Sequence, residues 1–154
     1  MRIALGSDHA GFRYRGLFEQ ALREAGHDLT VLGAEREEEP YDYTEVSEAV
    51  ARAVSEGRTE RGIIVAGSGN GEAIVANKIH GVRAAVCNDM YTAEMARRHN
   101  DSNILCLGQR ACGEAVALRV LEIWISTPFD GGRHATRVEH IAALEERLRK
   151  EYGG

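Results

Sequence analysis

The sequence contains little lysine, few cysteines, no excess of positive charge and no long hydrophobic run. Its 154 residues carry 19 basic and 24 acidic side chains, a formal net charge of −5. No global positive field can attract a nucleic-acid backbone or an anionic membrane, so we expect neither partner and only local anion sites. Lys78 and Lys150 are the only lysines. Arginine, whose planar guanidinium suits carboxylates and phosphates, therefore carries almost all the positive charge.

The three cysteines exclude two common uses of this residue. Cys87, Cys106 and Cys112 are an odd number without CxxC spacing, which argues against a disulfide framework and a zinc knuckle and predicts buried free thiols. No apolar run approaches the roughly 20 residues of a membrane helix. Met1 leads directly into a strand-like segment rather than a signal peptide, so we expect a cytoplasmic protein.

The length and the hydrophobic pattern predict one α/β domain over residues 1–154. Short apolar runs alternate with longer stretches of helical periodicity, as in parallel strands joined by crossover helices. Several runs are apolar on both faces, as a sheet covered on each side requires. We predict a Rossmann-like three-layer α/β/α sandwich with a five-stranded parallel sheet. The expected strands are 2–7, 28–32, 62–66, 83–87 and 103–107, and the expected helices are 11–25, 44–55, 72–79, 90–98 and 114–126.

An extra C-terminal helix is predicted after the break at residues 127–132. Apolar residues recur at helical spacing from Ala135 to Tyr152, with the regular part at about 135–151, and no strand follows. The helix can pack back on the sheet or on a partner subunit, and its own sequence favours neither arrangement.

Two loops at the carboxyl ends of predicted strands carry candidate functional residues, because ligands of open parallel sheets bind at that edge. The first loop holds Asp8 and His9, although Asp8 can equally be a helix cap. The second is the glycine-rich loop Gly67-Ser68-Gly69-Asn70-Gly71-Glu72. Its N–H groups can converge on an oxyanion or phosphate at a helix N-terminus, or it can be a tight turn without a ligand.

Glu72 gives the glycine-rich loop a more specific chemical interpretation. A carboxylate at the mouth of an anion cradle can act as a base beside the donors that stabilise the oxyanion it creates. A glutamate in the first helical turn can also merely complement the helix dipole, which would lower its pKa. A useful base here would therefore need compensating desolvation.

Two further groups of residues lie outside these loops. His99 and Asn100 end a helix at the amino edge of the sheet, where basic residues commonly complement the helix dipole. His99 could act as an acid at a carboxyl-edge site most easily if that site belonged to a partner subunit. Arg110 follows the last strand, and Arg133 and Arg137 share one helical face. These arginines suit a terminal phosphate, although exposed salt bridges are the simpler alternative.

Together these motifs resemble the ribose-5-phosphate isomerase B family over nearly the whole chain. The matching segments are Gly6-Ser7-Asp8-His9-Ala10-Gly11, the loop 67–72 with Ala76-Asn77-Lys78, and His99-Asn100-Asp101-Ser102-Asn103-Ile104-Leu105. The resemblance implies metal-free and cofactor-free interconversion of an aldose phosphate and a ketose phosphate. It also implies a homodimer or homotetramer with sites shared between two chains, and a last helix that reaches across the dimer.

The resemblance also implies roles for individual residues. Many family members have a cysteine base where this chain has Ala66, whereas another group has a glutamate at the position of Glu72, so Glu72 is the expected base. His99 would open the sugar ring with Asp8, and Ser68 would shuttle hydroxyl protons. The expected substrate-binding residues are the cradle residues Gly67, Gly69, Asn70 and Gly71, the phosphate ligands His9, Arg110, Arg133 and Arg137, and Tyr43 and Asn100 beside the sugar.

Three alternatives remain beside a ribose 5-phosphate isomerase. The same scaffold is similar to galactose-6-phosphate isomerase subunits and allose-phosphate isomerases, which act on six-carbon sugars. A nucleotide-binding regulatory module is also an α/β sheet with a glycine-rich turn, but it gives Glu72 and His99 no role. A paralogue without activity is the third, and the chain has every residue that the mechanism requires.

Overall fold

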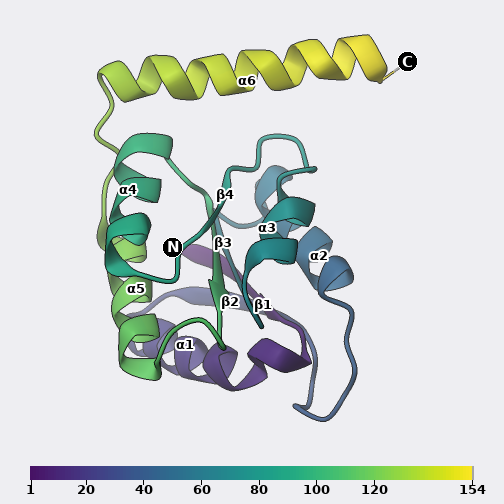
Figure 1. Ribbon diagram of the computed structural model, residues 1–154, viewed down its shortest axis with the longest axis vertical. Helices are drawn as coiled ribbons and strands as arrows, with labels where there is room; N and C mark the ends of the chain where they lie inside the picture. The colour runs from purple at the N-terminus through teal and green to yellow at the C-terminus, as the bar shows by residue number, and fades with distance from the viewer. Residues whose placement is uncertain (154) are drawn as a thin grey trace.

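The computed structural model describes residues 1–153 and contains one five-stranded sheet (Figure 1). Its strands are β1 (Arg2–Ser7), β2 (Asp28–Gly33), β3 (Arg61–Ala66), β4 (Ala84–Val86) and β5 (Ile104–Gly108), in the order β2-β1-β3-β5-β4. Every pairing is parallel. The helices are α1 (Phe12–Glu24), α2 (Tyr43–Ser55), α3 (Asn70–Ala76), α4 (Met90–Asn100), α5 (Glu114–Ser126) and α6 (Arg133–Tyr152).

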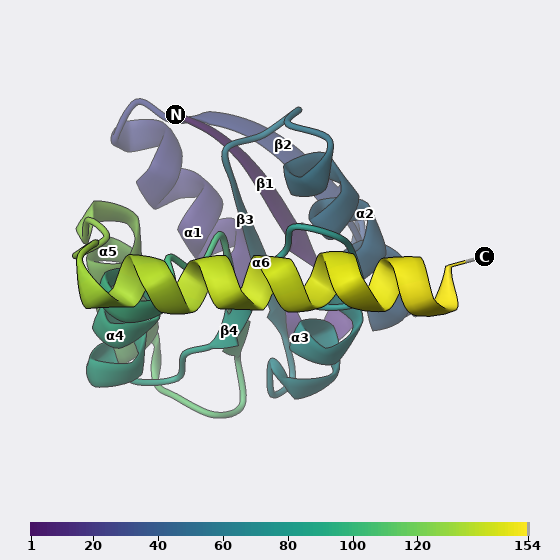
Figure 2. The same cartoon turned by 90° about the horizontal axis from the view of Figure 1, so that it is seen from above.

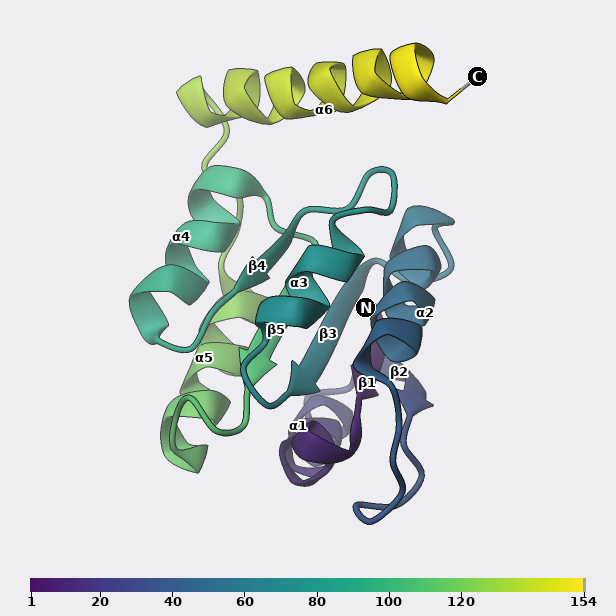
Figure 3. The same ribbon diagram turned by 45° about the vertical axis from the view of Figure 1, so that its right-hand side comes forward.

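Helices cover both faces of the sheet, because successive strand residues point to opposite sides. Ile63 and Val65 of β3 pack in the core formed with α1, α4 and α5, whereas Ile64 between them packs in the core formed with α2 and α3. Figure 3 shows these layers, with α2 and α3 on one side of the sheet. The predicted five-stranded parallel sheet and three-layer sandwich are confirmed.

The strand order places a topological switch point between β1 and β3, at the carboxyl ends of these strands. β1 pairs with β2 on one side and with β3 on the other, so the chain leaves these two neighbouring strands in opposite directions. Such a switch point is where open α/β sheets bind ligands. The loops that begin at Asp8 and Gly67 both start there.

Some predicted boundaries differ from the structure. β4 covers residues 84–86 instead of 83–87, and residues 9–11 form a short 3-10 turn before α1. α3 begins at Asn70, two residues before the predicted start, because Gly69 has a φ of +86° and ends the loop there. Glycine adopts this left-handed conformation without the steric penalty of a side chain. The early start leaves Glu72 in the first helical turn.

α6 lies across the amino ends of the strands, at the opposite edge of the sheet from the loops that begin at Asp8 and Gly67. The arrowheads of β3 and β5 point away from it (Figure 3), and Figure 2 shows it crossing the molecule above α4 and α3. None of its residues is buried. Among residues 1–153, no helix combines the length and the apolar character that crossing a bilayer demands.

Candidate active site

Asp8 is a helix cap and a buried carboxyl at the same time. Its Oδ1 accepts a hydrogen bond from the Gly11 N–H at 3.0 Å, so the capping interpretation is confirmed. Burial raises the pKa of Asp8, while the Gly11 N–H, His9 and Arg110 oppose that rise. The cap therefore fixes a buried carboxyl directly after β1.

The end of β3 and the start of the glycine-rich loop are hydrogen-bonded to the segment that follows β5. The Ala66 carbonyl accepts from the Gln109 N–H at 2.7 Å, and the Gly67 carbonyl accepts from the Arg110 N–H at 3.1 Å. In a trans peptide the carbonyl and the next N–H point in opposite directions. The N–H groups of Gly67 and Ser68 therefore point away from β5. The Ser68 hydroxyl accepts from the Asn70 N–H at 3.3 Å, which leaves its own proton available.

Glu72 is a buried carboxyl with one unpartnered oxygen. Glu72 is only 5% exposed, and its Oε2 has no hydrogen-bond partner among residues 1–153. Burial raises the pKa of Glu72, and the negative charge of Asp8 adds to this rise. The N–H groups of Glu72 and Gly69 lower the pKa without cancelling the effect of burial. The desolvation that a useful base needs at this position is therefore present.

Three further predicted residues lie at the same edge of the sheet, after β1, β2 and β5. The ring of Tyr43 lies against Gly71, since a Cβ added to Gly71 would be 2.7 Å from its Cε2. The Arg110 guanidinium lies over Gly67, with Nη1 3.5 Å from the corresponding Cβ position. His9 Nδ1 accepts from the Tyr41 N–H at 3.5 Å. We call Asp8, His9, Tyr43, residues 67–72 and Arg110 the carboxyl-edge cluster.

The remaining predicted residues lie together at the other edge of the sheet. His99 and Asn100 end α4, and Arg133 and Arg137 begin α6. Arg137 Nη1 donates to the Arg133 carbonyl at 2.9 Å, and neither arginine forms an ion pair within residues 1–153. We call these four residues the amino-edge cluster. The structure confirms that His99 lies at the amino edge, away from Glu72 of the same chain.

His134 belongs beside the amino-edge cluster but was not predicted from the sequence. Its ring stacks on that of His99, with centroids 4.0 Å apart and planes 5° from parallel. Burial and the charges of His99, Arg133 and Arg137 lower the pKa of His134. One sequence signal could have identified His134: it lies between Arg133 and Arg137, which were both predicted to bind the phosphate.

The neighbours of this histidine pair favour an anion over a metal ion. Donor atoms of His99, Asp130 and His134 lie within 4.8 Å of one another. The Asp130 carboxylate, however, already accepts two hydrogen bonds of 3.1 Å from Arg98, and Arg133 and Arg137 are adjacent. Guanidinium groups repel a cation and attract a phosphate.

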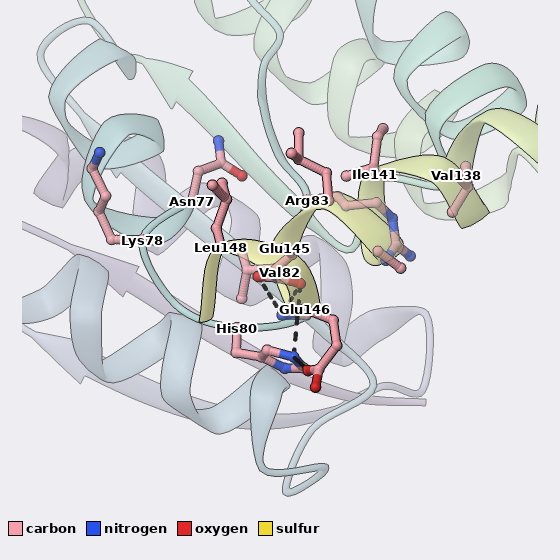
Figure 4. Close-up of a pocket in the computed structure, with 13 residues that line it drawn as sticks. Asn77, Lys78, His80, Val82, Arg83, Val138, Ile141, Glu145, Glu146 and Leu148 are labelled. Carbon is pink, nitrogen blue, oxygen red and sulfur yellow. Dashed lines mark hydrogen bonds and ion pairs between the residues drawn. The ribbon is translucent and has the colours of Figure 1, made fainter. Parts of the chain in front are cut away.

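A groove of about 720 Å³ separates α6 from the loop between α3 and β4. Figure 4 shows Val138, Ile141 and Leu148 of α6 facing Val82 and Arg83 across it. Glu145 accepts from the Gly81 N–H at 3.0 Å and lies 4.0 Å from His80. α6 is thus tied down by polar contacts at its centre, while Ile141, Leu144 and Leu148 stay 46%, 43% and 41% exposed.

The cysteines have no part in either cluster. Cys87 and Cys106 are buried and Cys112 is half-buried, and all three are free thiols. Burial raises the pKa of Cys87 to about 12 and that of Cys106 well above its ordinary value. A buried thiol with a raised pKa is not a nucleophile or a base at neutral pH.

The chain is similar to known proteins in both sequence and fold. The ribose-5-phosphate isomerase B of Escherichia coli is 39% identical over 95% of this chain and 97% of its own length. A structure of the Clostridium thermocellum ribose-5-phosphate isomerase B has 42% identity and a TM-score of 0.92, covering 96% of this chain and 99% of that one. The Mycoplasma genitalium ribose-5-phosphate isomerase B, determined with bound ribulose-5-phosphate, has 29% identity and a TM-score of 0.90 over 94% of this chain and 96% of that one. The family model described as Ribose/Galactose Isomerase matches residues 3–141, and the chain belongs to this family.

Proposed function

We propose that the protein is an aldose–ketose isomerase that interconverts ribose 5-phosphate and ribulose 5-phosphate. The observation that carries the proposal is the buried Glu72 carboxyl with its raised pKa, next to a loop in which the N–H groups of Gly67 and Ser68 point away from β5. Membership of the family and a relative that binds ribulose-5-phosphate support the substrate class. Three free thiols support a reducing, cytoplasmic location.

In this mechanism Glu72 transfers one proton between two carbons. Its carboxylate removes the proton from C2 of the open-chain aldose, and the electron pair moves to the carbonyl oxygen to give a cis-enediolate. The N–H groups of Gly67, Ser68, Gly69 and Gly71 stabilise that negative oxygen, and Ser68 transfers hydroxyl protons. Glu72 then returns its proton to C1, which gives the ketose.

Ring opening and phosphate binding use both clusters. His99 acts as the acid that opens the ring, and Asp8 accepts the proton of the anomeric hydroxyl. His9, Arg110, Arg133 and Arg137 bind the phosphate, while Tyr43 and Asn100 contact the sugar. The two clusters lie at opposite edges of one sheet, so we infer that each complete site combines the carboxyl-edge cluster of one chain with the amino-edge cluster of another.

The exposed apolar face of α6 supports this shared arrangement. A helix of 20 residues with none buried gains little stability from packing on its own chain. Ile141, Leu144 and Leu148 leave an apolar stripe open beside the groove, and such a stripe marks a protein interface. We propose a homodimer, or a homotetramer of dimers, in which α6 packs on the partner subunit.

Turnover measured with a chelator present tests the proposed function. The purified protein, incubated with ribose 5-phosphate and EDTA, is expected to form ribulose 5-phosphate. Glu72→Gln keeps the shape of the base and loses its proton transfer, so turnover should fall by at least about 10³-fold while substrate binding persists. Retained turnover in this variant would exclude Glu72 as the base. Faster turnover of allose 6-phosphate in a parallel assay would instead assign a six-carbon substrate.

A further inference from the structure

Three successive carbonyl groups, one at the end of β3 and two in the glycine-rich loop, accept hydrogen bonds from the segments that follow β5 and β4. The Ala66 and Gly67 carbonyls accept from the backbone N–H groups of Gln109 and Arg110. The Ser68 carbonyl differs, because its donor is a side chain: Asn88 Nδ2, at 3.3 Å. Two of the three contacts therefore depend only on backbone groups, whereas the third depends on the identity of residue 88.

Asn88 is itself fixed by β5. Its Oδ1 accepts from the Gly108 N–H at 2.8 Å, so one side-chain amide bridges the end of β5 and the loop. The loop packs closely on this strand, because a Cβ on Gly108 would lie 2.6 Å from Ser68 Cα. With both ends of the amide bonded, Asn88 has little freedom to rotate away from the Ser68 carbonyl.

The orientation of the Ser68 carbonyl determines the direction of the next N–H. The peptide between Ser68 and Gly69 is trans, so the Gly69 N–H points opposite to the carbonyl that Asn88 holds. Gly69 is the N-cap of α3 and Glu72 is its third helical residue, the position from which a glutamate carboxyl reaches back toward the N-cap N–H. The Gly69 N–H accordingly lowers the pKa of Glu72. Gly69 has a φ of +86°, and glycine is the most flexible residue of the backbone. The peptide therefore needs an external contact to stay in one orientation.

We propose that Asn88 is a positioning residue of the isomerase. Its amide holds the Ser68–Gly69 peptide so that the Gly69 N–H faces the carboxyl of the base and the oxyanion that forms beside it. Asn88 acts through this peptide and does not touch the substrate. The proposal rests on the proposed function only in taking Glu72 as the base.

Asn88→Ala tests the proposal by separating kcat from KM. We expect kcat to fall by about tenfold, with KM within about twofold of the wild type, because a cradle N–H is loosened rather than removed. The Glu72 carboxylate also loses an aligned donor, so its pKa rises further. The acid limb of the pH profile of kcat should therefore move to higher pH.

Asn103→Ala is the matched control. The Asn103 amide makes the same pair of contacts, accepting from the Arg83 N–H at 2.7 Å and donating to the Gly81 carbonyl at 2.8 Å. It lies at the amino end of β5 instead of the carboxyl end. Both variants should lose a similar amount of thermal stability, but only Asn88→Ala should shift the pH profile.

A titration that does not use turnover distinguishes this proposal from the proposed function. The carbon-13 signal of the Glu72 carboxyl is assigned by its absence in Glu72→Gln and is followed against pH in the wild type and in Asn88→Ala. A higher midpoint in Asn88→Ala is expected, and an unchanged midpoint with unchanged kcat overturns the positioning role even if Glu72→Gln is inactive. If Asn88→Ala does not fold, Asn88→Ser, whose hydroxyl is too short to bridge both backbone groups, is tested by the same two outcomes.

Discussion

The two edges of the sheet differ in how complete they are within one chain. At the carboxyl edge, Glu72 is buried and the loop before it is hydrogen-bonded on the β5 side. At the amino edge, His99 is half-buried, and Asn100, Arg133 and Arg137 belong to helix ends that cover no core. A base must be desolvated before substrate arrives to have a raised pKa, whereas phosphate ligands can stay hydrated until it binds. The difference supports the proposal that one chain supplies the base and its oxyanion donors, while a second chain supplies the ring-opening acid and part of the phosphate site.

Disrupting the interface of α6 should have the largest effect on activity, because dissociation would separate the amino-edge cluster from the partner chain. Leu144→Asp places a charge on the apolar face of α6, which the dimer is proposed to bury, so we expect dissociation and at least about a 10²-fold loss of activity. Size-exclusion chromatography with light scattering, together with the isomerase assay, measures both effects.

Ala143→Asp is the control for this change, since it introduces the same charge at an exposed position on the opposite face of α6. Its assembly and activity should match those of the wild type. A Leu144→Asp protein that remains dimeric and active would show that this face of α6 is not the interface.

Removing one guanidinium from the amino-edge cluster should have an intermediate effect. Arg137→Ala loses a charged phosphate contact that is made about equally in ground and transition states, so KM should rise by about tenfold to a hundredfold with kcat little changed. Steady-state kinetics on ribose 5-phosphate measures the two constants. Arg147→Ala, a change of another exposed arginine on α6, is the control and should leave KM unchanged. An equal KM in both variants would show that Arg137 does not bind the phosphate.

The smallest expected effect concerns stability at the carboxyl edge. The pKa of Glu72 is raised in the folded state, so the folded chain binds this proton more tightly than the unfolded chain, and the Glu72 contribution to stability falls as pH rises. Glu72→Gln has no charge to bury. Its Tm should equal that of the wild type near about pH 3.5 and exceed it by about 2–4 °C near pH 8. Calorimetry of both proteins at both pH values checks this. A Glu72→Gln protein with a lower Tm than the wild type at the higher pH would contradict a raised pKa of Glu72.

The sheet and the carboxyl-edge cluster were predictable because their signals are local. The run 63–65 is apolar on both faces, and Glu72 directly follows the glycine-rich segment 67–71 in the sequence. Topology also predicted that His99 lies at the amino edge, away from Glu72 of its own chain, since a segment that enters a strand lies at that edge. The desolvation of Glu72 depends on packing between separate segments, so the sequence could state it only as a requirement.

Asn88 and His134 were missed because their roles depend on contacts between distant segments. Asn88 lies 20 residues from both Ser68 and Gly108 along the chain, and no motif marks it. It does follow a predicted strand at the carboxyl edge, which is the one signal that could have selected it. Whether α6 packs on its own sheet or on a partner could not be decided from a periodicity that fits both.

Mixing two inactive variants tests the shared site most directly. In a dimer of Glu72→Gln with His99→Asn, one site receives both substitutions and the other receives neither. Random exchange makes half of the dimers mixed, each with one intact site, so activity should recover to about one quarter of the wild-type value. No recovery, with mixed dimers demonstrated by native mass spectrometry, would mean that Glu72 and His99 act within one chain and would contradict the shared site.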